Sequence, residues 1–294
     1  MNQNLKILVT GYKGQLGYDC VRELTNRGYK SVLGIDVDEL DITDENAVHK
    51  FIKDYCPDVI MHNAAWTAVD KAEESKDLVY KVNALGPKYI AEAAKEVDAK
   101  MVYISTDYVF DGRGIKPFEV DDPKNGLSTY GKTKSQGEDF VKKVLDKYFI
   151  VRISWVFGIN GNNFVKTMKK IALSGKNEIS VVSDQIGSPT YTVDLAKLLC
   201  DMIKTNKYGT YHATNEGCCS WAEFAEEIFK DLNVNVKVNH VTTDEYLKIV
   251  PNQTQRPLNS RMSKQSLLDN GFALLPNWKD AVKRYIENEL NKEN

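Results

Sequence analysis

Tyr130 and Lys134 stand four residues apart in the stretch STYGKTK, which covers residues 128–134. If Ser128 or Thr129 caps a helix here, side chains at this spacing lie on one helical face. An ammonium beside a phenol favours the phenolate and lowers the phenol pKa from about 10. Such a pair would donate a proton to an oxygen that gains negative charge. A chain with 15 Tyr also produces this spacing by chance, so the surrounding sequence must decide.

A glycine-rich stretch near the N-terminus is of the kind that binds a diphosphate. Gly11, Gly14 and Gly17 follow the apolar run 5–10 and open a helical pattern, the context that a dinucleotide fingerprint requires. Glycines permit a tight turn and let backbone N–H groups approach a pyrophosphate at the helix N-terminus. The spacing is GxxGxxG rather than GxGxxG, and a plain tight turn is the alternative.

Asp36 follows the second apolar run, where an acid accepts hydrogen bonds from the adenosine ribose hydroxyls. Asp38 and Glu39 add negative charge that repels a 2′-phosphate, whereas Lys13 can reach one. We therefore predict NADH as the cofactor, with NADPH also accepted. A turn-forming Asp after a strand is the alternative interpretation of Asp36.

The elements that must position these residues alternate in the first half of the chain. Short apolar runs at 5–10, 31–35, 58–62, 100–105 and 148–153 are separated by helical patterns near 15–27, 44–55, 73–97 and 129–146. This alternation predicts an α/β fold with a Rossmann-type, doubly wound parallel sheet. The second half is less regular, with helices expected near 162–173, 193–206, 220–232 and 277–291, and strands at 179–183, 208–213 and 235–241.

We predict two interleaved domains from this organisation. Residues 1–157 would bind NAD(P), residues 186–214 would return to that domain, and residues 158–185 and 215–294 would form a smaller substrate domain. In an open parallel sheet the carboxyl ends of the strands face the ligand crevice. Ser105 ends the fourth run, Thr106 follows it and Tyr130 begins the next helix, so all three are expected at this edge, where Ser105 or Thr106 could donate a hydrogen bond to a substrate oxygen.

The composition and charge of the chain argue against several classes of partner and location. The net charge of −2 provides no electrostatic footprint for nucleic acid or an acidic membrane. No apolar segment approaches the roughly 18 residues that span a bilayer, and no signal peptide precedes the first strand-like run. The five Cys are irregularly spaced and do not form a disulfide framework. We expect a cytoplasmic protein with neither nucleic acid nor membrane as a partner.

Taken together, the glycine triplet, the Ser/Thr after the fourth strand and the Tyr-x-x-x-Lys pair resemble the extended short-chain dehydrogenase/reductases. The stretches STDYVFDG, YGKTKSQGE, SWVFGINGNNFVKTM, DQIGSPTYT and QRPLNSRM are similar to the dTDP-4-dehydrorhamnose reductase family, and the resemblance spans residues 5 to about 262. The later stretch LPNWKDAVKRYI also fits. The resemblance implies NAD(P)H-dependent reduction of the C4 keto group of a dTDP-linked 6-deoxy-hexulose to dTDP-L-rhamnose, for polysaccharide biosynthesis.

The same resemblance implies roles for individual residues. It makes Tyr130 the proton donor, Lys134 the ligand of the nicotinamide ribose, and Thr106 the residue that steadies the keto oxygen. Asp107 and Trp155 would contact the sugar. The expected cofactor-binding residues are Gly11, Gly14, Gln15, Leu16, Asp36, Asp41, Ile42, Ala64, Ala65, Trp66, Ile104, Tyr130 and Lys134.

The resemblance also bears on assembly and metal binding. A homodimer is expected, and some members hold a magnesium ion at a dimer contact. After Ser188-Pro189-Thr190 this chain continues Tyr191-Thr192-Val193, with its first acid at Asp194. We therefore predict no metal.

Two residues outside the first half are candidates for the substrate diphosphate. Asn163 stands at an expected helix start, whose N-terminus favours an anion, and Arg256, one of seven Arg, can make bidentate phosphate contacts. A plain helix cap and a surface Arg are the alternatives. The alternatives for the whole protein are a reductase or epimerase of another nucleotide-linked keto sugar, or a non-catalytic, cofactor-binding regulatory subunit.

Overall fold

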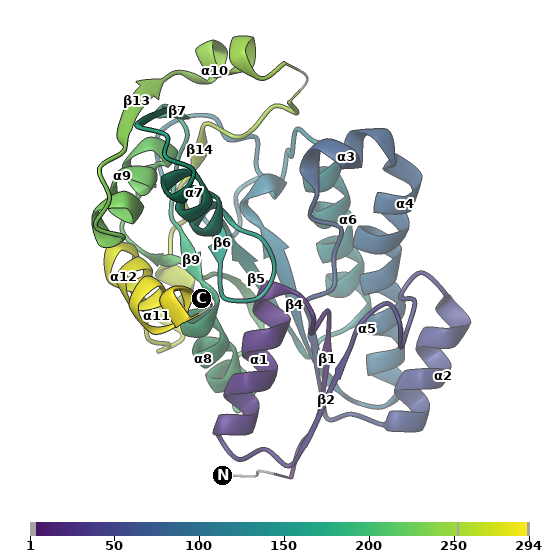
Figure 1. The fold of residues 1–294 in the computed structure, drawn as a ribbon. Helices are drawn as coiled ribbons and strands as arrows, with labels where there is room; N and C mark the ends of the chain where they lie inside the picture. The colour runs from purple at the N-terminus through teal and green to yellow at the C-terminus, as the bar shows by residue number, and fades with distance from the viewer. Residues whose placement is uncertain (1–3, 252, 293–294) are drawn as a thin grey trace.

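A six-stranded parallel sheet forms the centre of the molecule, with the strand order β10-β5-β4-β3-β1-β2 (Figure 1). The computed structural model describes residues 4–251 and 253–292. The strands are β1 (Lys6–Thr10), β2 (Ser31–Ile35), β3 (Val59–His62), β4 (Lys100–Thr106), β5 (Tyr148–Ile153) and β10 (Gly209–His212). The predicted Rossmann-type fold class is confirmed.

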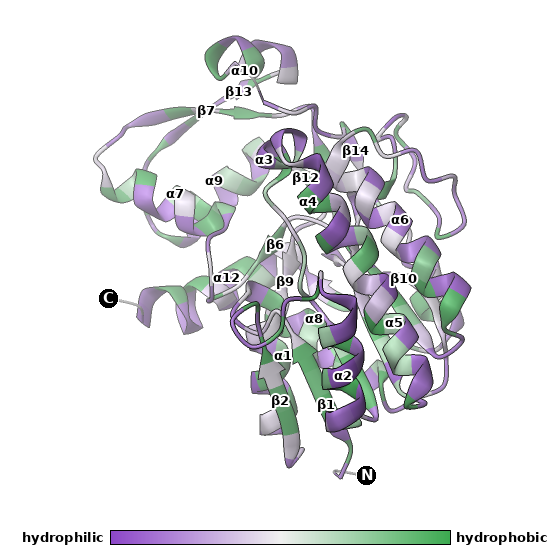
Figure 2. Cartoon of the chain, turned by 90° about the vertical axis from the view of Figure 1, so that its right-hand side faces the viewer, coloured by the Kyte–Doolittle hydropathy of each residue, from purple (hydrophilic) through white to green (hydrophobic). Residues whose placement is uncertain are grey.

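Helices cover both faces of this sheet. Ile7 and Val9 of β1 pack with α1 (Gln15–Asn26) and α8 (Thr192–Met202), while Leu8 packs on the opposite face with α2 (Glu45–Tyr55) and α5 (Gly86–Glu96). Successive strand side chains point to opposite faces, so strands buried on both sides become the continuous apolar runs seen in the sequence. Figure 2 shows these central strands as hydrophobic and the outer helix faces as hydrophilic.

The segment after β3 differs from the single helix predicted near 73–97. It forms α3 (Val69–Glu74), α4 (Lys76–Tyr80), a π-helical turn η1 (Lys81–Leu85) and then α5. Pro87 has no N–H, so the carbonyl of Asn83 loses its helical donor. The hydroxyl of Tyr103 donates to that carbonyl instead, at 3.3 Å, and Gly86 N–H bonds back to Lys81.

A smaller lobe is built from parts of the second half of the chain and has a core of its own. Its helices α7 (Phe164–Leu173), α9 (Trp221–Asp231) and α12 (Trp278–Asn288) pack together beside the paired strands β7 (Glu178–Val182) and β13 (Lys237–Val241). These elements were expected from the sequence. The short helices α10 (Thr243–Ile249) and α11 (Gln265–Asp269) were not.

Short strands and turns connect the two lobes. The short strands are β6 (Val156–Phe157), β8 (Ile186–Gly187), β9 (Thr190–Tyr191), β11 (Asn215–Glu216), β12 (Cys219–Ser220), β14 (Asn259–Ser260) and β15 (Leu275–Asn277), and the 3-10 turns are η2 (Asp107–Val109) and η3 (Leu290–Lys292). The longest helix, α6 (Thr129–Val144), belongs to the large lobe and packs on α5. Between β9 and β11 the chain returns to the large sheet, where β10 pairs with β5 and α8 packs on α1.

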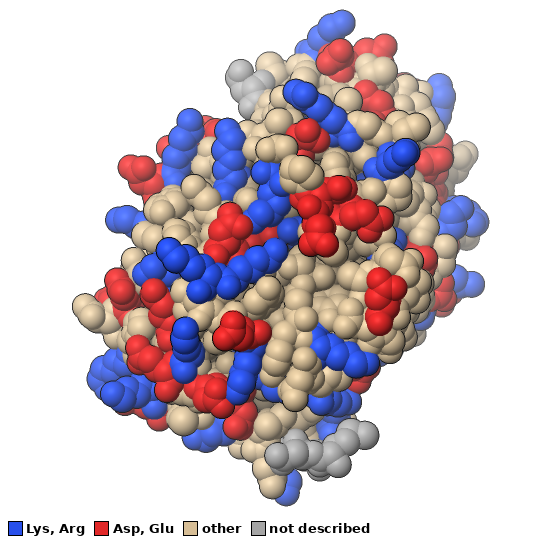
Figure 3. All heavy atoms as spheres, turned by 180° about the vertical axis from the view of Figure 1, so that it is seen from behind, with Lys and Arg blue, Asp and Glu red and all other residues tan. Residues whose placement is uncertain are grey.

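The surface carries both signs of charge. Lys and Arg side chains are interspersed with Asp and Glu over the face shown in Figure 3. All five Cys are free thiols. Within residues 4–251 and 253–292, none of the helices has the length and apolar character needed to cross a membrane.

Candidate active site

A cavity of about 1200 Å³ opens at the carboxyl ends of the central strands. It lies where β2 and β3 flank β1 on opposite sides, and such a reversal of strand order is where doubly wound sheets bind ligands. Most of the residues predicted from the sequence line it, namely Gly11, Gly14, Gln15, Leu16, Asp36, Asp41, Ile42, Ala64, Ala65, Trp66, Ile104, Thr106, Asp107, Tyr130, Lys134 and Trp155.

The glycine loop between β1 and α1 forms one end of the cavity. Gly11 has a φ of +67°, and a Cβ there would lie 2.7 Å from the backbone nitrogen of Ala64. Only glycine permits both the turn and this close approach. Gly14, the N-cap of α1, has no side chain to satisfy the first-turn N–H groups, so they are available to an anion. This cradle fits the pyrophosphate of a dinucleotide.

Carboxylates surround the outer rim of the glycine loop. Asp36 accepts a hydrogen bond from the backbone N–H of Lys13 at 3.1 Å, and the Lys13 ammonium lies 2.5 Å from Asp38 and 3.8 Å from Glu39. The lysine that could reach a 2′-phosphate is thus already held by the two acids expected to repel one.

The other end of the cavity holds the Tyr130–Lys134 pair. Helix α6 begins after Ser128, whose hydroxyl accepts the Gly131 N–H at 3.1 Å, as the sequence predicted. Tyr130 is half-buried, and its ring packs edge-on against Tyr108 with centroids 5.4 Å apart. Thr106, at the end of β4, lies close enough for its hydroxyl to act on the pKa of Tyr130.

The expectation that Lys134 lowers the pKa of Tyr130 is wrong for this structure. Burial raises the pKa of Tyr130 to about 12. The Lys134 amine donates instead to the carbonyl of Ile104 at 2.7 Å and stands 4.1 Å from the ring centroid of Tyr103. Its own burial lowers the pKa of Lys134 to about 7. Tyr130 is therefore a neutral phenol at physiological pH, which is the form that can give up a proton.

Asp107 is a buried carboxylate on the cavity wall. Only 3% of it is exposed, and burial raises its pKa to about 6. One carboxylate oxygen accepts the Thr106 hydroxyl at 2.9 Å, and the Ser260 hydroxyl lies near enough to oppose the rise in the pKa of Asp107. The other oxygen, Oδ2, has no partner at regular hydrogen-bond geometry within the described residues. An unsatisfied buried acceptor costs free energy, so this oxygen is suited to a hydroxyl of a bound ligand.

An aromatic wall completes the cavity, and the sequence indicated only Trp155 of it. Trp155, held in a left-handed conformation with φ 49°, stacks on Trp221 with ring centroids 3.8 Å apart. Phe164 and Phe224 line the cavity beside them. A Ser220–Glu223 capping box fixes the start of α9, and with it Trp221. This S-x-x-E signal was visible in the sequence, but it does not reveal which way Trp221 faces.

Two predicted substrate residues do not line the cavity. Asn163 caps α7: its Oδ1 accepts the Lys166 N–H at 2.9 Å, and its Nδ2 donates to the carbonyl of Gly158 at 2.8 Å. Its neighbours Gly161, Asn162 and Phe164 line the cavity instead. Arg256 lies beside Tyr108, which does line the cavity, and pairs with Asp70 at 2.7 Å.

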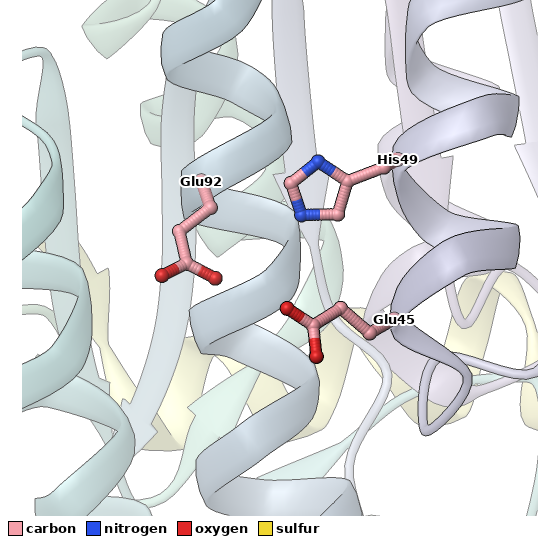
Figure 4. A group of neighbouring side chains, drawn as sticks. All are labelled: Glu45, His49 and Glu92. Atoms are coloured by element: carbon pink, nitrogen blue, oxygen red, sulfur yellow. The ribbon is translucent and has the colours of Figure 1, made fainter.

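One cluster of possible metal ligands lies away from this cavity. Figure 4 shows Glu45 and His49 of α2 facing Glu92 of α5, with one ligand atom of each within 4.8 Å of the others. Lys88 pairs with Glu92 and Glu96 with His49, so two of the three groups have protein partners. Asp194, the acid considered for a metal contact, is held by both guanidinium nitrogens of Arg284. The absence of a metal stays a prediction.

Comparisons with known proteins agree with this geometry. Residues 5–291 match the family model described as the RmlD substrate binding domain. A dTDP-4-dehydrorhamnose reductase structure from Clostridium acetobutylicum is 46% identical, with a TM-score of 0.92 over 96% of this chain and 99% of that one. The Bacillus anthracis dTDP-4-dehydrorhamnose reductase in complex with NADP is 42% identical, with the same TM-score and coverage. The spore coat polysaccharide biosynthesis protein SpsK of Bacillus subtilis is 39% identical over 96% of this chain and 97% of its own length.

Proposed function

This chain belongs to the RmlD substrate binding domain family, and we propose that it reduces the C4 keto group of dTDP-4-dehydro-L-rhamnose to give dTDP-L-rhamnose. Its cofactor is a reduced nicotinamide dinucleotide, NADH or NADPH. The relatives named as dTDP-4-dehydrorhamnose reductases, one of them complexed with NADP, support the substrate and the cofactor. The product is a precursor of cell-surface polysaccharide.

One observation carries this proposal. Tyr130, Lys134 and Thr106 gather at one end of a single cavity whose other end is the glycine loop. A dinucleotide bound by Gly11, Gly14, Gln15 and Leu16 can extend past Ala64, Ala65 and Ile104 to these three side chains. The aromatic wall of Trp155 and Trp221 then bounds the space left for the sugar.

The chain's own residues supply the proton chemistry. The bound nicotinamide supplies the hydride that adds to C4. Tyr130 is a neutral phenol whose pKa burial raises further, and it donates its proton to the oxygen that gains negative charge. The Thr106 hydroxyl, which donates to Asp107 in this structure, turns to donate its proton to the keto oxygen and so orients it. Asp107 accepts a sugar hydroxyl on Oδ2. Lys134 holds the ribose next to the nicotinamide.

The outer contacts belong to the same proposal. Asp36 binds the adenosine ribose, Asp41 and Ile42 contact the adenine, and Trp66 lies beside the cofactor; all four line the cavity. Arg256 binds the diphosphate after a movement of the Tyr108 side chain, and Asn163 acts by holding the helix start at 161–164.

We also propose that residues 1–157 with 186–214 form the cofactor domain, and that 158–185 and 215–294 form the substrate domain. The protein works as a cytoplasmic homodimer.

The test is a turnover assay with purified protein, NADH and dTDP-4-dehydro-L-rhamnose, followed by nicotinamide absorbance and product analysis. We expect one NADH oxidised for each dTDP-L-rhamnose formed. Oxidation with a UDP-linked keto sugar alone would favour the other reductase, and sugar interconversion without net NADH oxidation would favour an epimerase. Tight NADH binding without any turnover would favour the regulatory-subunit alternative.

A further inference from the structure

Helix α3 lies between the catalytic helix α6 and the loop that carries Arg256. It spans Val69–Glu74 and packs against α6. Val69 itself lines the cavity. This short helix therefore contacts three parts of the protein: the cavity, helix α6, and the loop after α10 that carries Arg256.

Glu73 makes the contact with α6. Its Oε1 accepts the backbone N–H of Thr129 and its Oε2 accepts the Thr129 hydroxyl, each at 2.7 Å. Burial acts to raise the pKa of Glu73, but the two hydrogen bonds from Thr129 outweigh it and the pKa is lowered. The carboxylate is thus ionised at neutral pH and sits at the N-terminus of α6, where the helix dipole favours it. Thr129 directly precedes Tyr130, so Glu73 fixes the backbone from which the phenol projects.

Asp70 makes the contact with the loop, one helical turn before Glu73. Its Oδ1 accepts the backbone N–H of Thr254 at 2.9 Å, and its Oδ2 accepts Nη2 of Arg256 at 2.7 Å. Arg256 in turn lies against Tyr108, where it opposes the rise that burial causes in the pKa of that phenol. The ring of Tyr108 packs against that of Tyr130. The loop is therefore connected to Tyr130 by two routes, one through Asp70 and Glu73 of α3 and one through Arg256 and Tyr108.

We propose that Asp70 and Glu73 are positioning residues, and that α3 couples the position of the loop that carries Arg256 to the orientation of the Tyr130 side chain. This inference rests on the proposed function and extends it to residues that touch neither the cofactor nor the reacting atoms. Asp70 fixes one edge of the guanidinium next to Tyr108, so that the remaining donors of Arg256 become available to the diphosphate when the Tyr108 side chain moves. Glu73 keeps the Tyr130 hydroxyl in line with the keto oxygen when that loop is engaged.

The experiment compares Asp70→Asn, Glu73→Gln and the double variant with the matched controls Glu74→Gln on the same helix and Asp77→Asn on α4, both exposed. A charged hydrogen bond is worth a factor of roughly ten or more. We expect Glu73→Gln to lower kcat about tenfold, with an unchanged KM for NADH and a larger solvent isotope effect on kcat. We expect Asp70→Asn to raise the KM for the nucleotide sugar about tenfold. The fold-loss in kcat/KM of the double variant should be smaller than the product of the fold-losses of the two single variants.

Several outcomes would overturn the inference. They are unchanged kcat and isotope effect in Glu73→Gln, multiplicative losses in the double variant, or the same losses in the two controls. If the wild-type protein does not turn over dTDP-4-dehydro-L-rhamnose, the proposed function fails separately. Amide hydrogen exchange at residues 129–131 then tests α3 without substrate: faster exchange in Glu73→Gln and in Asp70→Asn supports the coupling, and exchange altered in Glu73→Gln alone contradicts it.

Discussion

At the scale of single residues, burial shifts the pKa values of two groups of the site in opposite directions. It raises the pKa of Tyr130 to about 12, so that this phenol is even less ionised than in water, and it lowers the pKa of Lys134 to about 7. Both side chains line the same cavity, but the spacing implied an ammonium that lowers the pKa of the phenol, which the structure does not show. The direction of a pKa shift depends on burial and on the partner that the amine finds, here the Ile104 carbonyl. Neither can be read from a four-residue spacing.

The ionised carboxylate of Asp107 should lower the free energy of unfolding, because it is buried in the site. Its folded pKa of about 6 lies above the ordinary value of 3.8, so the folded state binds more protons between these values and stability falls as pH rises through them. We expect Asp107→Asn to raise the free energy of unfolding by about 1–3 kcal/mol at pH 8, with little change near pH 4, and to lower activity. Urea unfolding at both pH values measures this. An equal stability gain at both would contradict the assignment.

Lys13 should determine how well NADPH is used. Its ammonium already lies beside Asp38 and Glu39, and it offers the positive charge that a 2′-phosphate needs. We expect the wild-type protein to use NADH at least as efficiently as NADPH, and Lys13→Met to lower kcat/KM for NADPH about tenfold while changing that for NADH less than twofold. Equal losses with both cofactors would show that Lys13 supports the loop rather than the phosphate.

At the scale of elements, the loop between β1 and α1 is the most constrained part of the site. We expect Gly11→Ala to abolish measurable NADH binding, because the φ of +67° disfavours a side chain and the added Cβ would meet the backbone of Ala64 at 2.7 Å. Gly114→Ala is a matched control, since Gly114 also has a positive φ but meets no atom within 4 Å. Cofactor titration by fluorescence measures both. Undiminished NADH binding by Gly11→Ala would remove the loop from the cofactor site.

Some elements could be predicted from the sequence and others could not. The strands were predictable because burial on both faces makes each one a continuous apolar run. The stretch near 73–97 was not, because the effect of Pro87 depends on Tyr103, a residue distant in sequence that satisfies the freed carbonyl. Asp70 and Glu73 also escaped notice, since two acids on a short polar helix look like a solvated face until Thr129 and Thr254 are seen beside them.

At the scale of the whole molecule, an ion pair between a buried carboxylate and a partly exposed guanidinium joins the small lobe to the large one. Arg284 of α12 holds both oxygens of Asp194 on α8, at 2.9 and 2.7 Å, and Asp194 is 4% exposed. Removing the guanidinium leaves the carboxylate buried with Asn215 as its remaining donor. We expect Arg284→Ala to lower the free energy of unfolding by about 2 kcal/mol, and Lys283→Ala, on the exposed side of α12, by less than about 0.5 kcal/mol. Urea midpoints at equal slope measure the difference; equal effects would contradict it.

The central claim is that Tyr130 gives the proton to the reduced keto group, and one comparison tests it most directly. Tyr130→Phe keeps the ring and removes only the hydroxyl. Single-turnover NADH oxidation with saturating dTDP-4-dehydro-L-rhamnose should slow by about 10²–10⁴-fold, while NADH and the nucleotide sugar bind as they do to the wild-type protein. A Tyr130→Phe variant that oxidises NADH at nearly the wild-type rate would contradict the account.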